Sequence, residues 1–276
     1  MRDPAADLHI HTYYSDGTMS PQEVVSEAVR AGLSAIAIAD HDTIDGIPLA
    51  AEAGRKEGLE VLRAVELSCE QDGKDIHILG YLFEEESPLV RMLARMRQAR
   101  MDRMERMLAT LHGLGVTGIS MEEVCARTRS NAVGRLHLAK ILVEKGYARN
   151  LDQAFEKYLA EGGAAYFPKF KQTPREAIRL IKESGGLAVL AHPVITQRDE
   201  LIPSMVRDGL DGLEAYYPNC RMEVVERYLK MAKENAILVT GGSDAHGEGK
   251  DNTFIGKAYA PYVHVERMKE RKKRGG

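Results

Sequence analysis

Cysteine is scarce in this sequence of 276 residues, and long apolar stretches are missing. The three cysteines, Cys69, Cys125 and Cys220, are widely spaced and form no Cys-x-x-Cys pair, which argues against a disulfide framework and indicates a reducing compartment. No apolar run reaches the roughly 18 residues of a membrane span, and the N-terminus lacks the apolar stretch of a secretory leader. We therefore expect a cytoplasmic protein that does not associate with membranes.

A strong charge of either sign is also missing. The chain has 38 Lys and Arg residues against 41 Asp and Glu residues, a net charge of -3, so it has no overall attraction to nucleic acid or to an acidic membrane. An anionic substrate must therefore be attracted by a local field, such as that of bound cations. The length suits a single barrel of about 250 residues.

Short apolar segments recur along the chain, with polar residues at their ends. Residues 33–39, for example, are almost all apolar, which is typical of a strand buried on both faces. Similar patterns predict strands at residues 7–11, 33–39, 59–68, 76–83, 187–191, 212–216 and 237–240. Helical patterns separate most of them, at residues 20–32, 48–56, 174–184, 201–208 and 222–234. We therefore predict an α/β fold, a closed or nearly closed β/α barrel of seven strands whose polar ends converge.

The first predicted strand carries His9 and His11. Side chains alternate between faces along a strand, so both imidazoles point the same way. Asp16 follows in a Ser-Asp-Gly-Thr turn, from which its carboxylate can reach the same place. An isolated His-x-His pair is as often a surface feature as a ligand pair, so its meaning depends on the residues further along the chain.

Between residues 86 and 171 the pattern changes to helices alone, at residues 88–111, 120–128, 135–145 and 151–161. The first of these is long and amphipathic, with Leu and Met on one side and Arg on the other. Its Met residues suit core packing, because Met fills irregular gaps. We interpret residues 86–171 as a helical insertion that covers the mouth of the barrel as a lid, and residues 1–85 and 172–276 as the barrel.

Nine residues of metal-ligand type stand at or beside the ends of predicted strands. They are His9, His11, Asp16, His41, Glu66, His77, His192, Asp244 and His246. Imidazole and carboxylate ligands without thiolate suit zinc, manganese or iron rather than calcium or magnesium. Nine ligands exceed what one tetrahedral ion needs, so we expect two or three divalent ions, with Glu66 well suited to bridge two of them.

The same residues form motifs that resemble those of the PHP (polymerase and histidinol phosphatase) family. The motifs, in family order, are His9-x-His11, Ser15-Asp16-Gly17-Thr18, Asp40-His41-Asp42-Thr43, Glu66, His77, Ala191-His192-Pro193 and Gly242-Ser243-Asp244-Ala245-His246. The insertion is similar to that of the stand-alone members that act on nucleotides. Its matching residues are Asn131, Gly134, Arg135, His137, Leu138 and Ala139, followed by Tyr158-Leu159 and Ala165-Tyr166.

The resemblance implies a distorted seven-stranded, TIM-like barrel with a trinuclear metal site. Carried over motif by motif, the first ion is held by His9, His11, Glu66 and Asp244. The second is held by Glu66, His77 and His192, and the third by Asp16, His41 and His246.

The resemblance also implies a metal-dependent phosphoesterase. The expected substrates are nucleoside 3',5'-bisphosphates or short 5'-phosphorylated single-stranded RNA or DNA, and no obligate protein partner is expected. A hydroxide bridging the first two ions would attack phosphorus, and Arg135 would stabilise the charge that develops. Arg135, His137 and Asn131 would contact the substrate. His246 or a metal-bound water would protonate the leaving oxygen, and Asp40 would orient a ligand imidazole.

One departure from the family pattern and three alternatives remain. Relatives often have Tyr-x-Pro-x-His after the sixth strand, whereas this chain has Cys220 in place of the histidine. The alternatives are a phosphatase for histidinol phosphate or another small monoester, an amidohydrolase, and a metal-binding module without turnover. Glu66 disfavours the amidohydrolase, because such barrels often bridge their ions with a modified lysine, and a complete ligand set disfavours the inactive module.

Overall fold

The computed structural model describes residues 3–127, 133–168, 172–248 and 254–275. The chain divides into two compact units, which we call the barrel unit and the helical unit. The barrel unit is Met1–Met92 with Lys171–Gly276, and the helical unit is Leu93–Phe170. Among the described residues, no helix combines the length and the apolar character that crossing a membrane requires.

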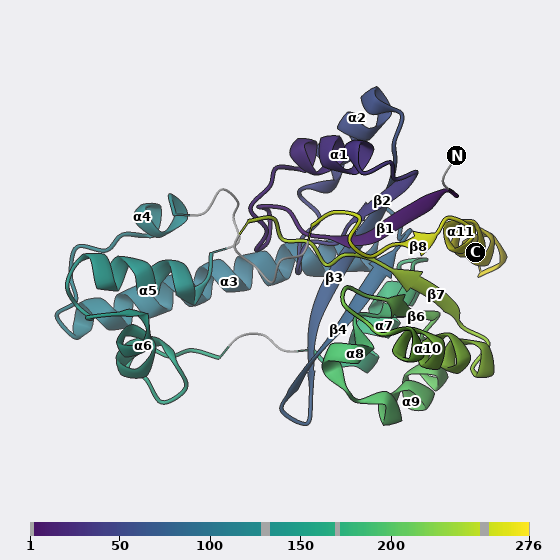
Figure 1. Ribbon diagram of the computed structural model, residues 1–276. Coiled ribbons are helices and arrows are strands. Elements are labelled where there is room, and N and C mark those ends of the chain that lie inside the picture. The colour runs from purple at the N-terminus through teal and green to yellow at the C-terminus, as the bar shows by residue number, and fades with distance from the viewer. Residues whose placement is uncertain (1–2, 128–132, 169–171, 249–253, 276) are drawn as a thin grey trace. The chain divides into compact units, whose positions relative to one another are not determined.

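The barrel unit contains one mixed sheet of eight strands (Figure 1). The strands are β1 (Ala5–Ile10), β2 (Ala35–Ile38), β3 (Glu60–Gln71), β4 (Lys74–Tyr81), β5 (Leu187–Leu190), β6 (Gly212–Tyr216), β7 (Leu238–Gly241) and β8 (Ala260–Pro261). Their order in the sheet is β7-β6-β5-β4-β3-β2-β1-β8. The predicted α/β barrel is confirmed, but the count of seven strands is one too low. The extra strand, β8, has two residues, too few for a recognisable pattern, and pairs antiparallel with β1.

The sheet nearly closes on itself between β1 and the segment that follows β7. Ile10 and Ala245 form a parallel bridge, and the backbone N–H of Asp244 donates to the carbonyl oxygen of His9 at 2.8 Å. Gly242 allows this approach, because a Cβ on it would lie 2.5 Å from the backbone nitrogen of His9. The segment after β7 thus meets β1 beside the first His-x-His motif.

Strand β4 runs antiparallel to both of its neighbours, β3 and β5. Asp72 and Gly73, with φ of 53° and 72°, connect β3 to β4, and a two-residue Asp-Gly connection is typical of a β-hairpin. In an antiparallel strand the first residues lie at the edge where parallel strands end. His77, near the start of β4 and paired with Ser68 of β3, therefore lies at the same edge as the other strand-end residues.

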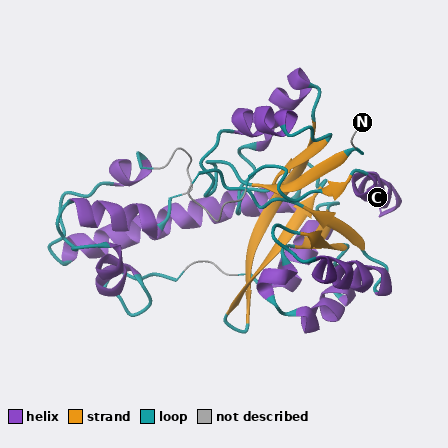
Figure 2. Ribbon diagram, in the orientation of Figure 1, coloured by secondary structure: helices purple, strands orange, loops and turns teal. Residues whose placement is uncertain are grey.

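Helices flank the strands of the barrel unit (Figure 2). They are α1 (Pro21–Arg30), α2 (Ile47–Glu57), α7 (Pro174–Glu183), α8 (Pro193–Thr196), η2 (Asp199–Leu201), α9 (Ile202–Arg207), α10 (Met222–Glu234) and α11 (Val263–Gly275). A capping box begins α1, since Ser20 and Glu23 each accept a hydrogen bond from the other's backbone N–H. The sheet packs a core that includes Leu8, Leu62 and Val189.

The helical unit has its own hydrophobic core. Its helices are α3 (Pro88–Gly113), which begins in the barrel unit, α4 (Met121–Cys125), α5 (Arg135–Glu144), α6 (Leu151–Ala154) and the π-helix η1 (Phe155–Leu159). Met104 and Met107 are buried beside Leu138 and Leu142, which confirms that the Met residues pack the core. The helix predicted over 151–161 is instead one turn of α-helix followed by a π-helix, which widens the backbone before Gly162 and Gly163.

We expect Gly242→Ala to lower the free energy of unfolding by about 1–3 kcal/mol. The new methyl group would collide with the backbone of His9 and increase the separation between β1 and the segment after β7. Thermal unfolding followed by circular dichroism measures the change. Gly113→Ala is the matched control, since a Cβ at that position meets no atom within 4 Å. Equal melting temperatures for the Gly242→Ala variant and the wild type would contradict this account of the closure.

Candidate metal centre

All nine predicted ligand residues lie at one edge of the barrel, on or directly after six of its strands. His9 is in β1, Glu66 in β3 and His77 in β4, and the others follow β1, β2, β5 or β7. Five imidazoles form a closed ring of neighbours. Their centroid distances are 5.0 Å for His9–His11, 4.7 Å for His11–His41, 5.0 Å for His41–His77, 5.2 Å for His77–His192 and 5.7 Å for His192–His9. His246 stacks on His11 at 4.1 Å.

Glu66 contacts all five imidazoles of this ring. Its Oε1 lies 2.8 Å from Nδ1 of His77 and 3.0 Å from Nε2 of His192. Its Oε2 lies 3.2 Å from a ring nitrogen of each of the other three, His9, His11 and His41. Burial alone would raise the pKa of Glu66, but the surrounding imidazoles hold that pKa well below its ordinary value. A carboxylate that reaches every imidazole of the ring has the geometry of a bridging ligand.

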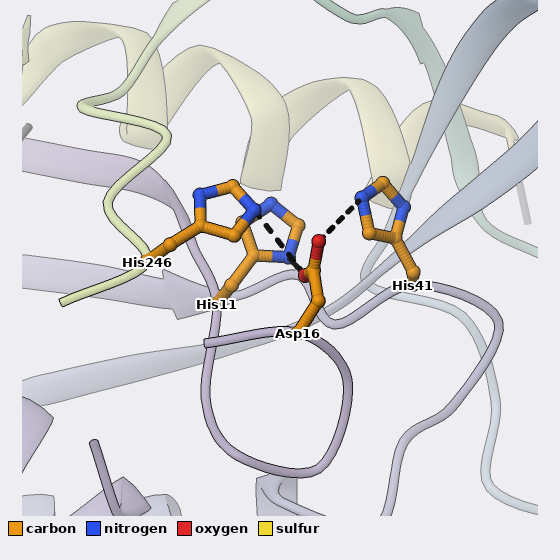
Figure 3. A group of neighbouring side chains, drawn as sticks. All are labelled: His11, Asp16, His41 and His246. Carbon is orange, nitrogen blue, oxygen red and sulfur yellow. Dashed lines mark ion pairs between the residues drawn. The ribbon is translucent and has the colours of Figure 1, made fainter. Parts of the chain in front are cut away.

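A second group of ligand atoms surrounds Asp16. Figure 3 shows its carboxylate between His246 and His11 on one side and His41 on the other. Its Oδ1 lies 3.2 Å from Nε2 of His246 and 3.7 Å from Nδ1 of His11, and its Oδ2 lies 3.9 Å from Nε2 of His41. Burial opposes ionisation of Asp16, but the neighbouring imidazoles of His246 and His41 lower its pKa.

Asp244 completes a third group with the first two histidines. Its Oδ1 lies 3.0 Å from Nε2 of His11 and 3.5 Å from Nε2 of His9. Three sets of ligand atoms therefore lie close enough to share an ion: His11 with Asp16, His41 and His246; His9 with His11 and Asp244; and His41 with Glu66 and His77. These sets differ in detail from those implied by the family resemblance, because His11 and His41 each face two groups.

The residues present fit divalent ions. Several buried atoms of the cluster lack a hydrogen-bond partner among the described residues: His9 Nε2, His11 Nδ1 and Nε2, His41 Nδ1, Glu66 Oε2, His192 Nδ1 and His246 Nε2. A buried polar atom without a partner is costly, and so many at one place point to an absent partner. Imidazole nitrogens and carboxylate oxygens are donors that suit zinc, manganese and iron.

The packed imidazoles cannot all carry a proton. Burial lowers the pKa of His41 to about 4, with Glu66 opposing and His11 adding to the shift. Burial also opposes protonation of His11, yet the neighbouring carboxylates of Asp244 and Glu66 raise its pKa to about 9. Neighbouring imidazoles thus differ widely in proton affinity.

The hydrogen-bond donors to Asp40 lie in the turn that follows β1. Its buried carboxylate accepts hydrogen bonds from the backbone N–H of Thr12 at 2.7 Å, the hydroxyl of Thr12 at 2.7 Å and the hydroxyl of Ser15 at 2.6 Å. These donors all belong to the turn after β1, and the expectation that Asp40 orients a ligand imidazole stays a prediction. Asp40 fixes the turn that carries Asp16.

Two buried carboxylates of the site were missed from the sequence. Asp7 accepts hydrogen bonds at 2.8 Å from the backbone N–H groups of Ser243 and Gly256, and burial raises its pKa to about 6. Glu214 contacts His9 and His192. The available signal was an acidic residue inside an apolar strand pattern, which is unusual unless that residue has partners.

The predicted substrate contacts belong to the helical unit. Arg135 donates from Nη1 to the carbonyl oxygen of Leu159 at 3.0 Å, and its guanidinium lies 5.7 Å from the ring centre of Tyr166. His137 accepts a hydrogen bond from the backbone N–H of Gly134 at 3.1 Å. Asn131 lies outside the described residues. Cys220, in the barrel unit, is partly buried after β6, and its burial raises its pKa.

The family follows from a direct comparison. A model of the PHP domain matches residues 7–249. The chain belongs to the PHP family. A crystal structure from Bifidobacterium adolescentis, named as a candidate metal-dependent phosphoesterase, is 32% identical to the chain, covers 98% of both chains and has a TM-score of 0.77. The resemblance inferred from the motifs is confirmed, and so is the enzyme class of metal-dependent phosphoesterase.

Curated relatives of similar identity differ in name. A 5'-3' exoribonuclease of Haemophilus influenzae is 33% identical over 87% of this chain and 89% of its own. A 3',5'-nucleoside bisphosphate phosphatase of Chromobacterium violaceum is 28% identical over 91% and 90%. A phosphoribosyl 1,2-cyclic phosphate 1,2-diphosphodiesterase of Eggerthella lenta is 31% identical over 88% and 94%. All three names describe the cleavage of phosphate esters.

We expect Asp244→Ala and His77→Ala to abolish phosphoesterase activity and to lower the content of bound transition metal, because each change removes a ligand from the cluster. In chelator-treated wild type, Mn²⁺ at about 100 times its dissociation constant should add about 2.7 kcal/mol to the free energy of unfolding. Metal analysis and thermal unfolding with and without Mn²⁺ measure both effects.

His112→Ala is the control for these variants. His112 lies in the helical unit, where its Nε2 contacts the carbonyl oxygen of Ile119 at 2.9 Å, so its loss should leave metal content and the gain from Mn²⁺ unchanged. A full metal complement in the Asp244→Ala variant would contradict the assignment of the ligands.

Proposed function

We propose that this PHP phosphoesterase hydrolyses phosphate esters of nucleotides, either nucleoside 3',5'-bisphosphates or short 5'-phosphorylated oligonucleotides. The observation that carries the chemistry is the ring of five imidazoles around the buried Glu66, which suits two or three ions of manganese, zinc or iron. The names of the H. influenzae and C. violaceum relatives support nucleotides as the substrate class.

Divalent ions bound in this cluster supply charge for the phosphoryl oxygens and a hydroxide at neutral pH. The chain contributes the fixed positions of the nine ligands, all of which come from the edge of one sheet. It also contributes burial, because His9, His11 and Glu66 are almost completely shielded from solvent. Charges fixed in advance in a shielded site stabilise a transition state without reorganisation.

His246 acts in this proposal as a ligand rather than as the proton donor. Its Nδ1 lies 2.8 Å from the backbone carbonyl oxygen of Asp244, which can only accept, so Nδ1 carries the proton. The lone pair of Nε2 is then free to bind an ion beside Asp16, whose Oδ1 lies 3.2 Å away. A water molecule is therefore the better candidate to protonate the leaving oxygen.

The helical unit supplies cationic contacts to the phosphates in this proposal, with Arg135 and His137 foremost. Burial lowers the pKa of the half-buried Arg103, and the nearby guanidinium groups of Arg135 and Arg100 lower that pKa further. Like charges held close together favour an anionic ligand. Tyr166 beside Arg135 adds an aromatic face on which a base can stack.

The substrate class is tested by product release from a panel of compounds, measured as inorganic phosphate from monoesters and as mononucleotides from RNA. We expect nucleoside 3',5'-bisphosphates or short 5'-phosphorylated RNAs to give the highest kcat/KM with Mn²⁺, and chelator to abolish release. The panel includes histidinol phosphate and a cyclic ribose phosphate, the other phosphate classes raised by the family and the relatives. Predominant release from either of these would overturn the nucleotide proposal and leave the phosphoesterase class intact.

The contact from Arg135 is tested separately. Arg135→Gln should lower kcat/KM for the preferred nucleotide by about 10- to 100-fold, mainly through a higher KM, because it removes a charged hydrogen-bond donor worth about 1.5–3 kcal/mol. Steady-state kinetics on wild type and variant measure the effect. Arg127→Gln is the control, since Arg127 is already paired with Glu144 at 2.8 Å. Equal losses in both variants would argue against a specific role for Arg135.

A further inference from the structure

Glu214 is the middle residue of β6, and its side chain is buried beside the predicted ligands without being one of them. Its two neighbouring strands, β5 and β7, each lead directly into ligand-bearing segments. A buried carboxylate is costly unless it is paired or hydrogen-bonded. The partners of Glu214 therefore indicate its role.

The first partner is the imidazole of His9. Nδ1 of His9 lies 3.2 Å from Oε1 and 3.3 Å from Oε2 of Glu214. A carboxylate accepts hydrogen bonds, so Nδ1 carries the proton in this contact. The opposite nitrogen, Nε2, then keeps a lone pair and faces Glu66 at 3.2 Å and Asp244 at 3.5 Å. Such a carboxylate fixes both the tautomer and the direction of a metal-binding imidazole.

The second partner is the backbone of His192. Its N–H donates to Oε2 of Glu214 at 2.8 Å. His192 has φ of 27° and ψ of 59°, a backbone conformation that is strained for a residue with a side chain, and it precedes Pro193, which restricts it further. This bend points the imidazole at the cluster, where Nε2 lies 3.0 Å from Oε1 of Glu66.

We propose that Glu214 is a positioning residue that holds two metal ligands, from separate strands, with one carboxylate. The alternation of side chains along β1 directs the ring of His9 toward the cluster, and Glu214 selects the tautomer of that ring. Glu214 also stabilises the backbone bend that directs the imidazole of His192 toward the cluster. Because Glu66 contacts both of these imidazoles, the loss of Glu214 would weaken metal binding through His9 and through His192 together. This inference rests on the proposed ligand set, in which His9 and His192 bind ions.

Asp211 provides a matched comparison for Glu214. It directly precedes β6, is also a largely buried carboxylate, and accepts hydrogen bonds from the backbone N–H of Ala188 at 2.9 Å and from Nζ of Lys182 at 2.7 Å. It lies at the opposite end of the strand from the cluster, and within the described part of the chain its carboxylate accepts hydrogen bonds from Lys182 and Ala188 rather than from a predicted ligand. Its removal therefore reports the purely structural cost of losing a buried carboxylate beside β6.

The experiment compares wild type, Glu214→Gln and Asp211→Asn after chelation and reloading with Mn²⁺. A glutamine keeps one acceptor oxygen but replaces the other with an NH₂ donor. With its oxygen toward the N–H of His192, its NH₂ takes the place of Oε1 and faces Nδ1 of His9, which disfavours the tautomer that the carboxylate selects. We expect Glu214→Gln to weaken Mn²⁺ binding by about 10- to 100-fold and to lower the number of ions bound per chain. Titration calorimetry and elemental analysis measure affinity and stoichiometry.

Thermal unfolding of the chelated proteins separates positioning from stability. Asp211→Asn should lower the melting temperature and keep the Mn²⁺ affinity of the wild type. A Glu214→Gln variant that binds Mn²⁺ within twofold of wild type would overturn the inference, and so would an equal loss of affinity in Asp211→Asn. Wild-type protein that takes up no ion would overturn the proposed ligand set itself, which distinguishes the two failures.

Discussion

The site depends on one buried negative charge, the carboxylate of Glu66. Removing a carboxylate from water costs several kcal/mol unless partners compensate, and five imidazoles contact this one. Those imidazoles come from β1, β4 and the segments after β1, β2 and β5, so the charge is compensated only when the strands are assembled in their observed order. The same arrangement gathers the ligands of the proposed ions, which links the stability of the fold to the chemistry of the site.

A set of outer carboxylates holds the inner ligands in place. Asp40 fixes the turn that carries Asp16, Asp7 fixes the loop that begins with Ser243, and Glu214 contacts His9 and His192. Each outer carboxylate accepts from backbone N–H groups, so each holds a segment of chain as well as a side chain. Backbone positions with positive φ at His192 and Asp244 persist within this framework. The geometry of the site thus depends on residues that need not touch a substrate.

The sequence predicted well which residues gather at this edge of the barrel, because polar residues at the ends of apolar strands stand out in the pattern. The position of His77 was predicted, but the antiparallel direction of β4, which brings it to the site, was not, although Asp72-Gly73 carried the signal. Strand β8 was too short to be recognised, and the partners of Asp40 depend on a turn whose path the sequence does not specify. Glu214 was overlooked because a single acidic residue in a strand has no periodicity, and its role exists only in three dimensions.

The closure of the barrel joins residues that lie far apart along the chain. The backbone N–H of Ser243 donates to the side chain of Asp7, 236 positions earlier. During synthesis, therefore, the first histidines leave the ribosome long before the segment that completes their surroundings. Contacts of such long range form late and slow the folding of a domain. A growing polypeptide that has not yet reached Ser243 therefore holds an incomplete set of the proposed ligands.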